Sequence, residues 1–340
     1  MRPATADRPP RTLLVSVSLI SASALAYEVL LMRLFSIIQW HHFAYMIISV
    51  ALLGYGASGT FLTLFQNRLL PRFHFTFVTA AGAFAMTAVL GFAIAQRIPF
   101  NPLELVWDGR QSLYLAGVYL LLFVPFLFAA SAVGLALSRF HAHIGRIYSF
   151  DLAGAGAGAF SVVALLLVLS PGGCLKALSA AAFAGALLAS ATLLEKRHHR
   201  IAATLISGAL VLLLLAPASW TRPRISEYKG LSLALQAAGA RVVHEESGPL
   251  GLLTVLENDQ IPFRQAPGLS LNCAQEPPPQ LALFTDGDSM SALNAFDGRM
   301  ETLDYLVHVQ VVQHRALRPT LRHSALHWVL VAHAVSAQSH

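Results

Sequence analysis

The sequence predicts a mainly α-helical, polytopic membrane protein with about seven transmembrane helices and a small C-terminal β-rich (α+β) module. Hydrophobic residues make up 56% of the 340 residues and charged residues only 12%, with a mean hydropathy of +0.60. This composition is too apolar for an ordinary soluble domain. The charges are also unevenly placed, since several long stretches before residue 222 contain none, whereas the residues after Trp220 have a more polar composition.

Charge-free apolar runs predict membrane-spanning helices, because about 20 apolar residues are needed to cross a bilayer core of about 30 Å. We expect such helices near 12–33, 43–65, 74–95, 112–138, 149–170, 175–194 and 201–217. A basic N-terminal tail, 1–11, precedes this transmembrane domain, 12–217. The first run contains Glu28 and Arg33 and lacks a small-residue cleavage site, so we interpret it as a retained helix rather than a cleaved signal.

Positive charge gathers in alternate loops. The N-terminus and the loops at 66–73, 139–147 and 195–200 carry ten Lys and Arg residues, and the opposite loops carry four. By the positive-inside rule, the N-terminus is therefore cytoplasmic. Seven crossings would put 218–340 outside, whereas an eighth crossing or a re-entrant segment would reverse this, so the side of the soluble part stays open.

Two glycine patterns lie inside these charge-free runs. Gly54–Gly59 formally matches the GxGxxG pattern of dinucleotide-binding loops, and Gly154–Gly158 alternates glycine with alanine. A dinucleotide site requires the glycines to follow a strand and an acidic residue to lie about 20 positions further on. Because both patterns lie within expected helices, and Gly154 and Gly158 share one helix face, we interpret them as sites of close helix packing.

Polar side chains inside the membrane region are costly to bury, so they mark candidate sites. They are Glu28 and Arg33 in the first helix, His41 and His42 after it, and Asp151 at the start of the fifth. One interpretation is an interfacial belt, with both carboxylates in structural hydrogen bonds. The other is a cavity that binds a cationic or polar ligand. The pair His41-His42 has no third ligand at a suggestive spacing, so no metal site is expected.

The soluble segment, 218–306, is interpreted as a small β-rich module. We expect a short helix over 231–238, ending at Gly239, and strands over 241–243, 252–256 and 281–285. Asp286-Gly287-Asp288 follows the last of these strands. Two acids that flank a glycine are typical of a tight turn, and contact with a cationic substrate is the alternative. The module has no catalytic triad or metal signature in its sequence.

Several segments, in this order along the chain, resemble membrane-embedded spermidine synthase-like proteins of bacteria. In the membrane part they are 28–36 (EVLLMRLFS), 42–45 (HFAY), 51–56 (ALLGYG) and 147–155 (IYSFDLAGA). In the soluble part they are 228–231 (YKGL), 247–251 (SGPLG), 266–271 (APGLSL) and 283–288 (LFTDGD), which are similar to the β-hairpin domain that precedes the catalytic domain of that family. The resemblance covers about residues 12–306.

The resemblance implies an aminopropyl- or methyltransferase whose donor is decarboxylated S-adenosylmethionine or S-adenosylmethionine itself. In the family, a Rossmann-like catalytic domain begins after the segment matching Asp304-Tyr305, whereas only 35 residues follow Tyr305 here. We therefore expect a truncated, catalytically incomplete chain with no cofactor of its own, and whether it is an enzyme stays open. Gly251 stands where soluble spermidine synthases carry a donor-contacting Gln, which argues further against aminopropyl transfer.

The tail, 307–340, is interpreted as an aberrant or disordered segment rich in His and Arg. From Tyr305 to His340 the chain has no Asp or Glu, yet it carries six of the fourteen histidines. The favoured hypothesis is that a frameshift or a premature stop replaced the catalytic domain. The competing hypothesis is a genuine short tail that binds an acidic surface or a metal.

Two functions are consistent with these features. The first is a membrane-bound spermidine synthase-like protein, multi-pass in the bacterial cytoplasmic (inner) membrane, whose helices recognise a cationic substrate. The alternative is a multi-helix transport or ligand-binding protein with the soluble module as a lid. The expected partners are the lipid bilayer and a cationic small molecule such as a polyamine, with no nucleic acid. The substrate and self-association into a homo-oligomer stay open.

Overall fold

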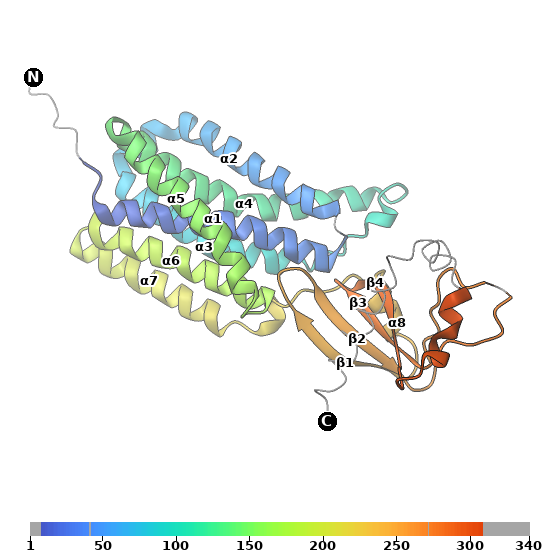
Figure 1. Cartoon of the computed structure of the whole chain (residues 1–340). Helices are drawn as coiled ribbons and strands as arrows, with labels where there is room; N and C mark the ends of the chain where they lie inside the picture. The colour runs from blue at the N-terminus through green and yellow to red at the C-terminus, as the bar shows by residue number, and fades with distance from the viewer. Residues whose placement is uncertain (1–7, 41, 271, 309–340) are drawn as a thin grey trace, which may run out of the picture. The chain divides into compact units, whose positions relative to one another are not determined.

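The computed structural model describes residues 8–40, 42–270 and 272–308, and it divides the chain into two compact units. Residues up to Arg224, with Ser247–Pro249, form the helical unit. Ile225–Glu246 and the residues from Leu250 onward form the sheet unit. Figure 1 shows the helices and strands of each unit with their labels. Each unit has its own buried hydrophobic cluster, and each is described by itself below.

Seven long helices account for most of the described part of the helical unit. They are α1 (Arg11–Ile38), α2 (His42–Leu69), α3 (Phe73–Ala95), α4 (Gly109–Arg139), α5 (Ile144–Leu166), α6 (Pro171–Leu193) and α7 (Lys196–Leu215). Each overlaps one of the helices expected from the charge-free runs, with ends that differ by several residues because capping and loop packing set them. α4 continues as a helix through Pro125.

Six stretches of described helix are long and apolar enough to cross a membrane. They are Arg11–Ile38, Tyr45–Ala95, Gly109–Arg139, His141–Leu166, Pro171–Leu193 and Lys196–Leu215. The second is 51 residues long and includes both α2 and α3, which the 3-10 turn η1 (Leu70–Arg72) joins. The class of a multi-pass, mainly helical membrane protein is therefore supported. Seven separate crossings, as expected from the sequence, are not confirmed.

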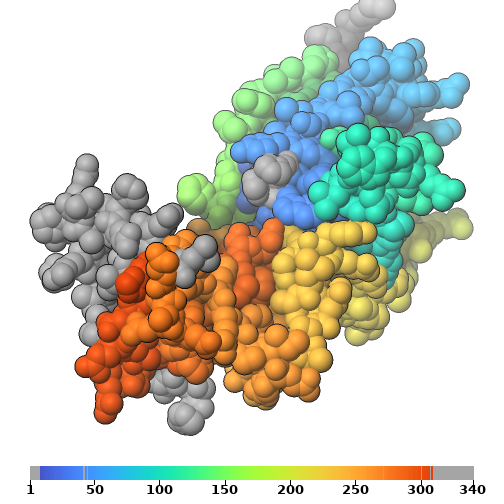
Figure 2. Space-filling model, turned by 90° about the vertical axis from the view of Figure 1, so that its right-hand side faces the viewer, coloured from blue at the N-terminus to red at the C-terminus, as the bar shows by residue number. Residues whose placement is uncertain are grey.

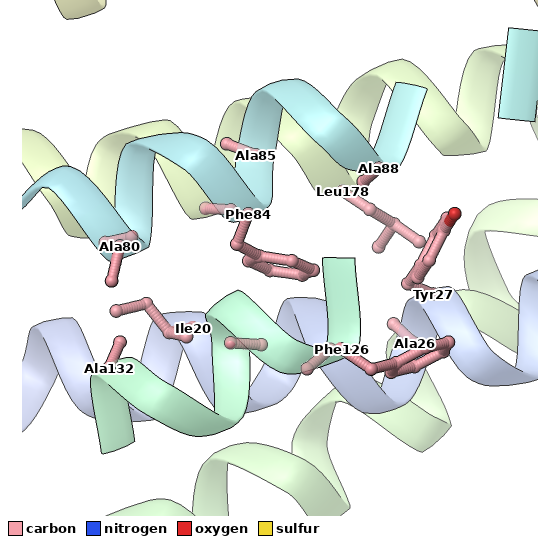
Figure 3. Packing of buried hydrophobic residues seen from close by; sticks show 14 of the residues in the cluster. Ile20, Ala26, Tyr27, Ala80, Phe84, Ala85, Ala88, Phe126, Ala132 and Leu178 are labelled. Carbon is pink, nitrogen blue, oxygen red and sulfur yellow. The ribbon is translucent and has the colours of Figure 1, made fainter. Parts of the chain in front are cut away.

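Helix α1 is the central element of the helical unit. It packs most extensively against α5 and α6 and also contacts α2 and α4 (Figure 1). Its inner face is almost wholly buried and apolar, and it meets α3 and α4 through an aromatic cluster (Figure 3). In that cluster the Tyr27 ring lies 6.4 Å from the Phe84 ring and 5.4 Å from the Phe126 ring. On α3, the small side chains of Ala85 and Ala88 follow the large ring of Phe84, so large and small side chains alternate in this core.

The sheet unit contains a four-stranded antiparallel sheet in the order β1-β2-β3-β4. The strands are β1 (Ala240–Ser247), β2 (Leu252–Asn258), β3 (Gln280–Thr285) and β4 (Asp288–Asn294), and a short helix, α8 (Gly230–Leu235), packs on β4. Leu256 on β2 lies opposite Ala282 on β3, which in turn lies opposite Ala292 on β4. The three strands expected from the sequence are present, and β4 is additional.

The sheet unit has a small core. Only Leu231, Leu256, Ala282 and Phe284 form its fully buried apolar cluster among the described residues. Alternate residues of β3 are buried, so one face of the sheet carries this core. Strand β1 is exposed from Arg241 to Glu246 on both faces.

The ends of the helices also carry exposed apolar side chains. In the connection between α3 and α4, turquoise at the surface in Figure 2, Trp107 is 77% exposed and Val106 is 84% exposed. This connection includes the 3-10 turn η2 (Pro102–Glu104), which the Asn101 side chain caps by accepting the Leu103 N–H at 3.0 Å. An exposed tryptophan at a helix end is typical of the aromatic belt at a membrane boundary.

Candidate functional site

The closest helix pair in the structure, α1 and α5, depends on two glycines. A Cβ atom added to Gly154 would collide with the backbone carbonyl of Ser18, and one added to Gly158 would collide with that of Ala22. The two helix backbones therefore touch along one face, as small residues four apart allow. The packing interpretation of Gly154 and Gly158 is confirmed. In the other pattern, a Cβ added to Gly54 would collide with the Cβ of Phe126, whereas one added to Gly56 or Gly59 would meet nothing within 4 Å.

The close approach of these helices brings Asp151 of α5 against α1. The Ser21 hydroxyl donates a hydrogen bond to the Asp151 carboxylate. Ser21 is 7% exposed, and Asp151 is half-buried. A serine in a transmembrane helix can satisfy its hydroxyl within its own helix, so a bond to another helix fixes the pair in register. One oxygen of the carboxylate is therefore held in place, as the structural interpretation of Asp151 expected.

Glu28, also on α1, is a second acid in the same region, and it has no such partner. Ten residues separate it from Ile38 at the end of the helix, which corresponds to about 15 Å and to the middle of a bilayer core. Its side chain is half-buried. Within the described part of the chain, no hydrogen bond or ion pair is made by its carboxylate.

Tyr55 on α2 lies near both acids. The negative charges of Glu28 and Asp151 are both close enough to act on its hydroxyl group. Its ring lies 6.2 Å from the Phe126 ring, and Gly54 allows α2 to approach Phe126 this closely. Tyr55 is 38% exposed, so its ring is supported on one side and open on the other. Three helices, α1, α2 and α5, therefore contribute to one polar constellation, which we call the acidic triad site (Glu28, Tyr55 and Asp151).

The region around the acidic triad site has an unbalanced charge. The segments 12–32, 43–67 and 147–166 of its three helices contain Glu28 and Asp151 but no Lys or Arg, and Arg33, Arg68 and Arg146 lie just beyond them. A carboxylate in an apolar medium is costly unless it is paired or neutralised. The arrangement is therefore suited to a positively charged group, and the Tyr55 ring offers that group an aromatic face.

Arg33 follows Glu28 five residues further along the same helix. Its guanidinium donates to the Ser36 hydroxyl at 3.1 Å, one turn further along α1. The other sequence-predicted residues of this region are less well placed. His41 lies outside the described residues, and His42 begins α2 with a side chain that is also outside them. A cavity shared by Glu28, Asp151 and the two histidines therefore stays a prediction.

A small pocket lies at one end of the helical unit and does not include the acidic triad site. Its volume is about 30 Å³, and its lining includes Phe35, Phe43, Phe100 and the amide side chains of Gln39 and Gln96. The Gln39 amide donates to the Phe100 carbonyl at 3.3 Å. A volume of this size holds about two water molecules, so it is too small for an organic ligand.

In the sheet unit, Asp286 and Asp288 belong to the turn between β3 and β4. Asp286 and Gly287 have φ values of 54° and 72°, the positive values that a two-residue type I′ hairpin turn requires. The Asp286 carboxylate accepts the Leu252 N–H at 2.8 Å, and its carbonyl accepts the Lys229 ammonium at 2.6 Å. The turn interpretation is confirmed. Contact of either acid with a cationic substrate stays a prediction, and Asp286 is already bonded on both its carboxylate and its carbonyl.

Sequence reasoning missed Tyr55 and Ser21 as members of the site. Tyr55 was hidden inside the glycine pattern, and Ser21 is one of several serines in α1. A tyrosine between two glycines in a charge-free helix is a usable signal, because the glycines leave its ring room against neighbouring helices. Comparison with known protein families, with characterised proteins and with solved structures found no match to this chain.

Proposed function

We propose that the helical unit binds a small organic cation at Glu28, Tyr55 and Asp151, in the manner of a ligand-binding membrane protein. The observation that carries this proposal is that Asp151 of α5 is bonded to Ser21 of α1, the helix of Glu28, while α2 with Tyr55 packs on the same helix. Each carboxylate favours a cation in a low-dielectric setting, and the aromatic ring adds a cation–π contact.

The resemblance to spermidine synthase-like proteins supports the same site. The segments that carry it in the membrane part include 28–36, 51–56 and 147–155, and these contain Glu28, Tyr55 and Asp151 respectively. Segments far apart in the sequence thus supply one residue each. On this basis the cation is a polyamine or a similar linear amine, which offers ammonium groups for the carboxylates and methylene groups for the aromatic ring.

The test is calorimetric titration of the purified protein with spermidine. We expect saturable binding that weakens about tenfold in Glu28→Gln and in Asp151→Asn, because each loses a charge-assisted contact. Glu195→Gln serves as the control, since its side chain is 89% exposed and belongs to a helix end. Equal affinity in wild type and both site variants, or an equal loss in the control, would contradict the proposal. Uptake of labelled spermidine into proteoliposomes would then distinguish transport from binding alone.

A second candidate function, transfer from an S-adenosylmethionine-type donor, is favoured by the sheet unit. The antiparallel meander of β2, β3 and β4 agrees with the β-hairpin domain that the resemblance implies. Titration with S-adenosylmethionine and with its decarboxylated form tests this candidate. Saturable binding of either donor would support a transferase, and absence of binding of both would contradict this second candidate.

A further inference from the structure

Two connections between helices lie together at one end of the helical unit. The turn η1 leads from α2 into α3, and the 3-10 turn η3 (His141–His143) leads from α4 into α5. Both pack on α4, and they are joined by an edge-to-face contact of 5.7 Å between the rings of Phe73 and Phe140. The Arg139 guanidinium lies 5.4 Å from the centre of the same Phe140 ring. The two turns therefore form one surface, which we call the double-turn surface (residues 68–76 and 139–148).

The charge of the double-turn surface is entirely basic. It carries the exposed side chains of Arg68, Arg72, Arg139 and Arg146, with His74, His141 and His143 beside them. Neither 68–76 nor 139–148 contains an Asp or Glu. The third basic loop on the same predicted side of the membrane, 195–200, differs because it contains an acid, and Glu195 lies 3.9 Å from His198 there. The double-turn surface therefore concentrates positive charge without an internal acid.

The backbone adds to this charge. Helix α5 begins at the double-turn surface without a side-chain hydrogen bond at its N-cap, whereas the first N–H of α3 already donates to the Leu70 carbonyl of η1. A helix N-terminus presents N–H groups and a partial positive charge, which favour an anion. At the start of α5, a Cβ added to Gly145 would meet nothing within 4 Å, so the first turn of this helix is open to approach.

Exposed apolar side chains adjoin the basic groups. Phe75 is 61% exposed in the first turn of α3, Ile144 is 49% exposed at the start of α5, and Tyr148 is 54% exposed one turn later. A free phosphate ion would not contact such groups favourably, whereas the acyl chains of a lipid would. Basic side chains between the ends of transmembrane helices are a known arrangement for anionic lipid headgroups.

We infer that the double-turn surface binds the phosphate of an anionic phospholipid headgroup. The arginines and the N-terminus of α5 contact the phosphate oxygens, and Phe75, Ile144 and Tyr148 contact the start of the acyl chains. This site is separate from the acidic triad site and does not depend on cation binding there.

The experiment is native mass spectrometry of the whole protein in a neutral detergent, titrated with phosphatidylglycerol and with phosphatidylcholine. We expect wild type to bind phosphatidylglycerol about tenfold more tightly than phosphatidylcholine, because several charge-assisted contacts are available only to the anionic lipid. Replacing Arg72 and Arg139 together by Gln should abolish this preference. The matched pair Arg197→Gln and Arg200→Gln removes the same charge from α7 and should retain it.

Gly145→Asp is a second variant that does not remove any arginine. An acid in the first turn of α5 is favourable for the helix, so loss of lipid preference in this variant cannot be attributed to unfolding. Equal effects of the two arginine pairs would overturn the inference, because they would indicate general charge attraction. Competition by glycerol 3-phosphate at the same concentration as the lipid would also overturn it, because it would indicate a site for a soluble anion. Spermidine titration of the same variants should be unchanged.

Discussion

Asp286 of the sheet unit and Glu28 of the helical unit differ in how their carboxylates are bonded. In the sheet unit, Asp286 accepts a backbone N–H and a lysine at its carbonyl, and its backbone completes a hairpin turn. In the helical unit, Glu28 is half-buried at mid-helix and has no hydrogen-bond or ion-pair partner among the described residues. Burial of a carboxylate in an apolar helix is costly unless it is paired. The bonds of Asp286 are explained by the fold of the hairpin, whereas the placement of Glu28 supports the proposal of a bound cation.

The largest effect is expected from a substitution that forces α5 away from α1. Gly154→Val would push a side chain into the Ser18 backbone and separate α5 from α1. Overpacking of this kind should cost about 3 kcal/mol of the free energy of unfolding, and it should also remove Asp151 from the acidic triad site. Thermal unfolding in detergent measures the loss. Gly156→Val is the control, because a Cβ there meets nothing within 4 Å, and an equal loss in both would contradict the packing argument.

The next largest effect is expected at the β3–β4 turn of the sheet unit. Lys229 is 2% exposed, and its ammonium bonds the Asp286 carbonyl. Lys229→Met should destabilise the sheet unit by about 2 kcal/mol, because it removes a charge-assisted hydrogen bond from a buried ammonium group to the hairpin turn. Hydrogen exchange of the β3 and β4 amides reports this opening. Arg264→Gln breaks an exposed ion pair with Glu276 at 2.7 Å and should change the same exchange rates little.

A smaller effect distinguishes the hydrogen bond that Asp151 makes with Ser21 from its proposed contact with a cation. Ser21→Ala removes the hydroxyl that holds the carboxylate, which should lower the free energy of unfolding by about 1 kcal/mol. Cation affinity should be retained, since the charge remains. Calorimetry with spermidine on Ser21→Ala and Asp151→Asn makes the comparison. A weakening of binding as large in the serine variant as in the aspartate variant would mean that Asp151 is only a structural group.

The smallest effect is a pH dependence in the sheet unit. Asp297 accepts the Arg299 N–H and the Thr302 hydroxyl, and these bonds lower the pKa of its carboxyl below the usual 3.8. A lowered pKa in the folded state means that the stabilisation is present at neutral pH. It is lost as the pH falls from the pKa of the free carboxyl through the lower pKa of the folded state. Asp297→Asn should therefore lower the melting temperature slightly at pH 7, and the difference should shrink in acid. A difference that grows in acid would contradict this assignment.

Much of the helical unit could be predicted from the sequence, because a charge-free apolar run long enough to cross a bilayer has few alternatives to a helix. Packing at Gly154 and Gly158 followed from their spacing alone. The acidic triad site could be predicted only in part. Glu28 and Asp151 are conspicuous as charges, whereas the involvement of Tyr55 depends on how α2 lies against α4 and α1, and no local pattern encodes this.

The sheet unit shows where local signals are insufficient. Strand β4 has the sequence DSMSALN, which lacks β-branched and aromatic residues, so its propensity gives no indication of a strand. It becomes one because the turn at Asp286-Gly287 directs it back along β3, with Leu281 opposite Leu293. The turn could be predicted from its residues, but the strand that it creates depends on a partner.

The bond between Lys229 and Asp286 joins residues 57 positions apart. The Leu252 N–H that binds the same aspartate lies 34 positions before it. During synthesis, the hairpin therefore emerges after the two segments that bond to its turn. A shorter protein prepared from the sheet unit must begin before Lys229, because a later start would remove the ammonium group that donates to the Asp286 carbonyl.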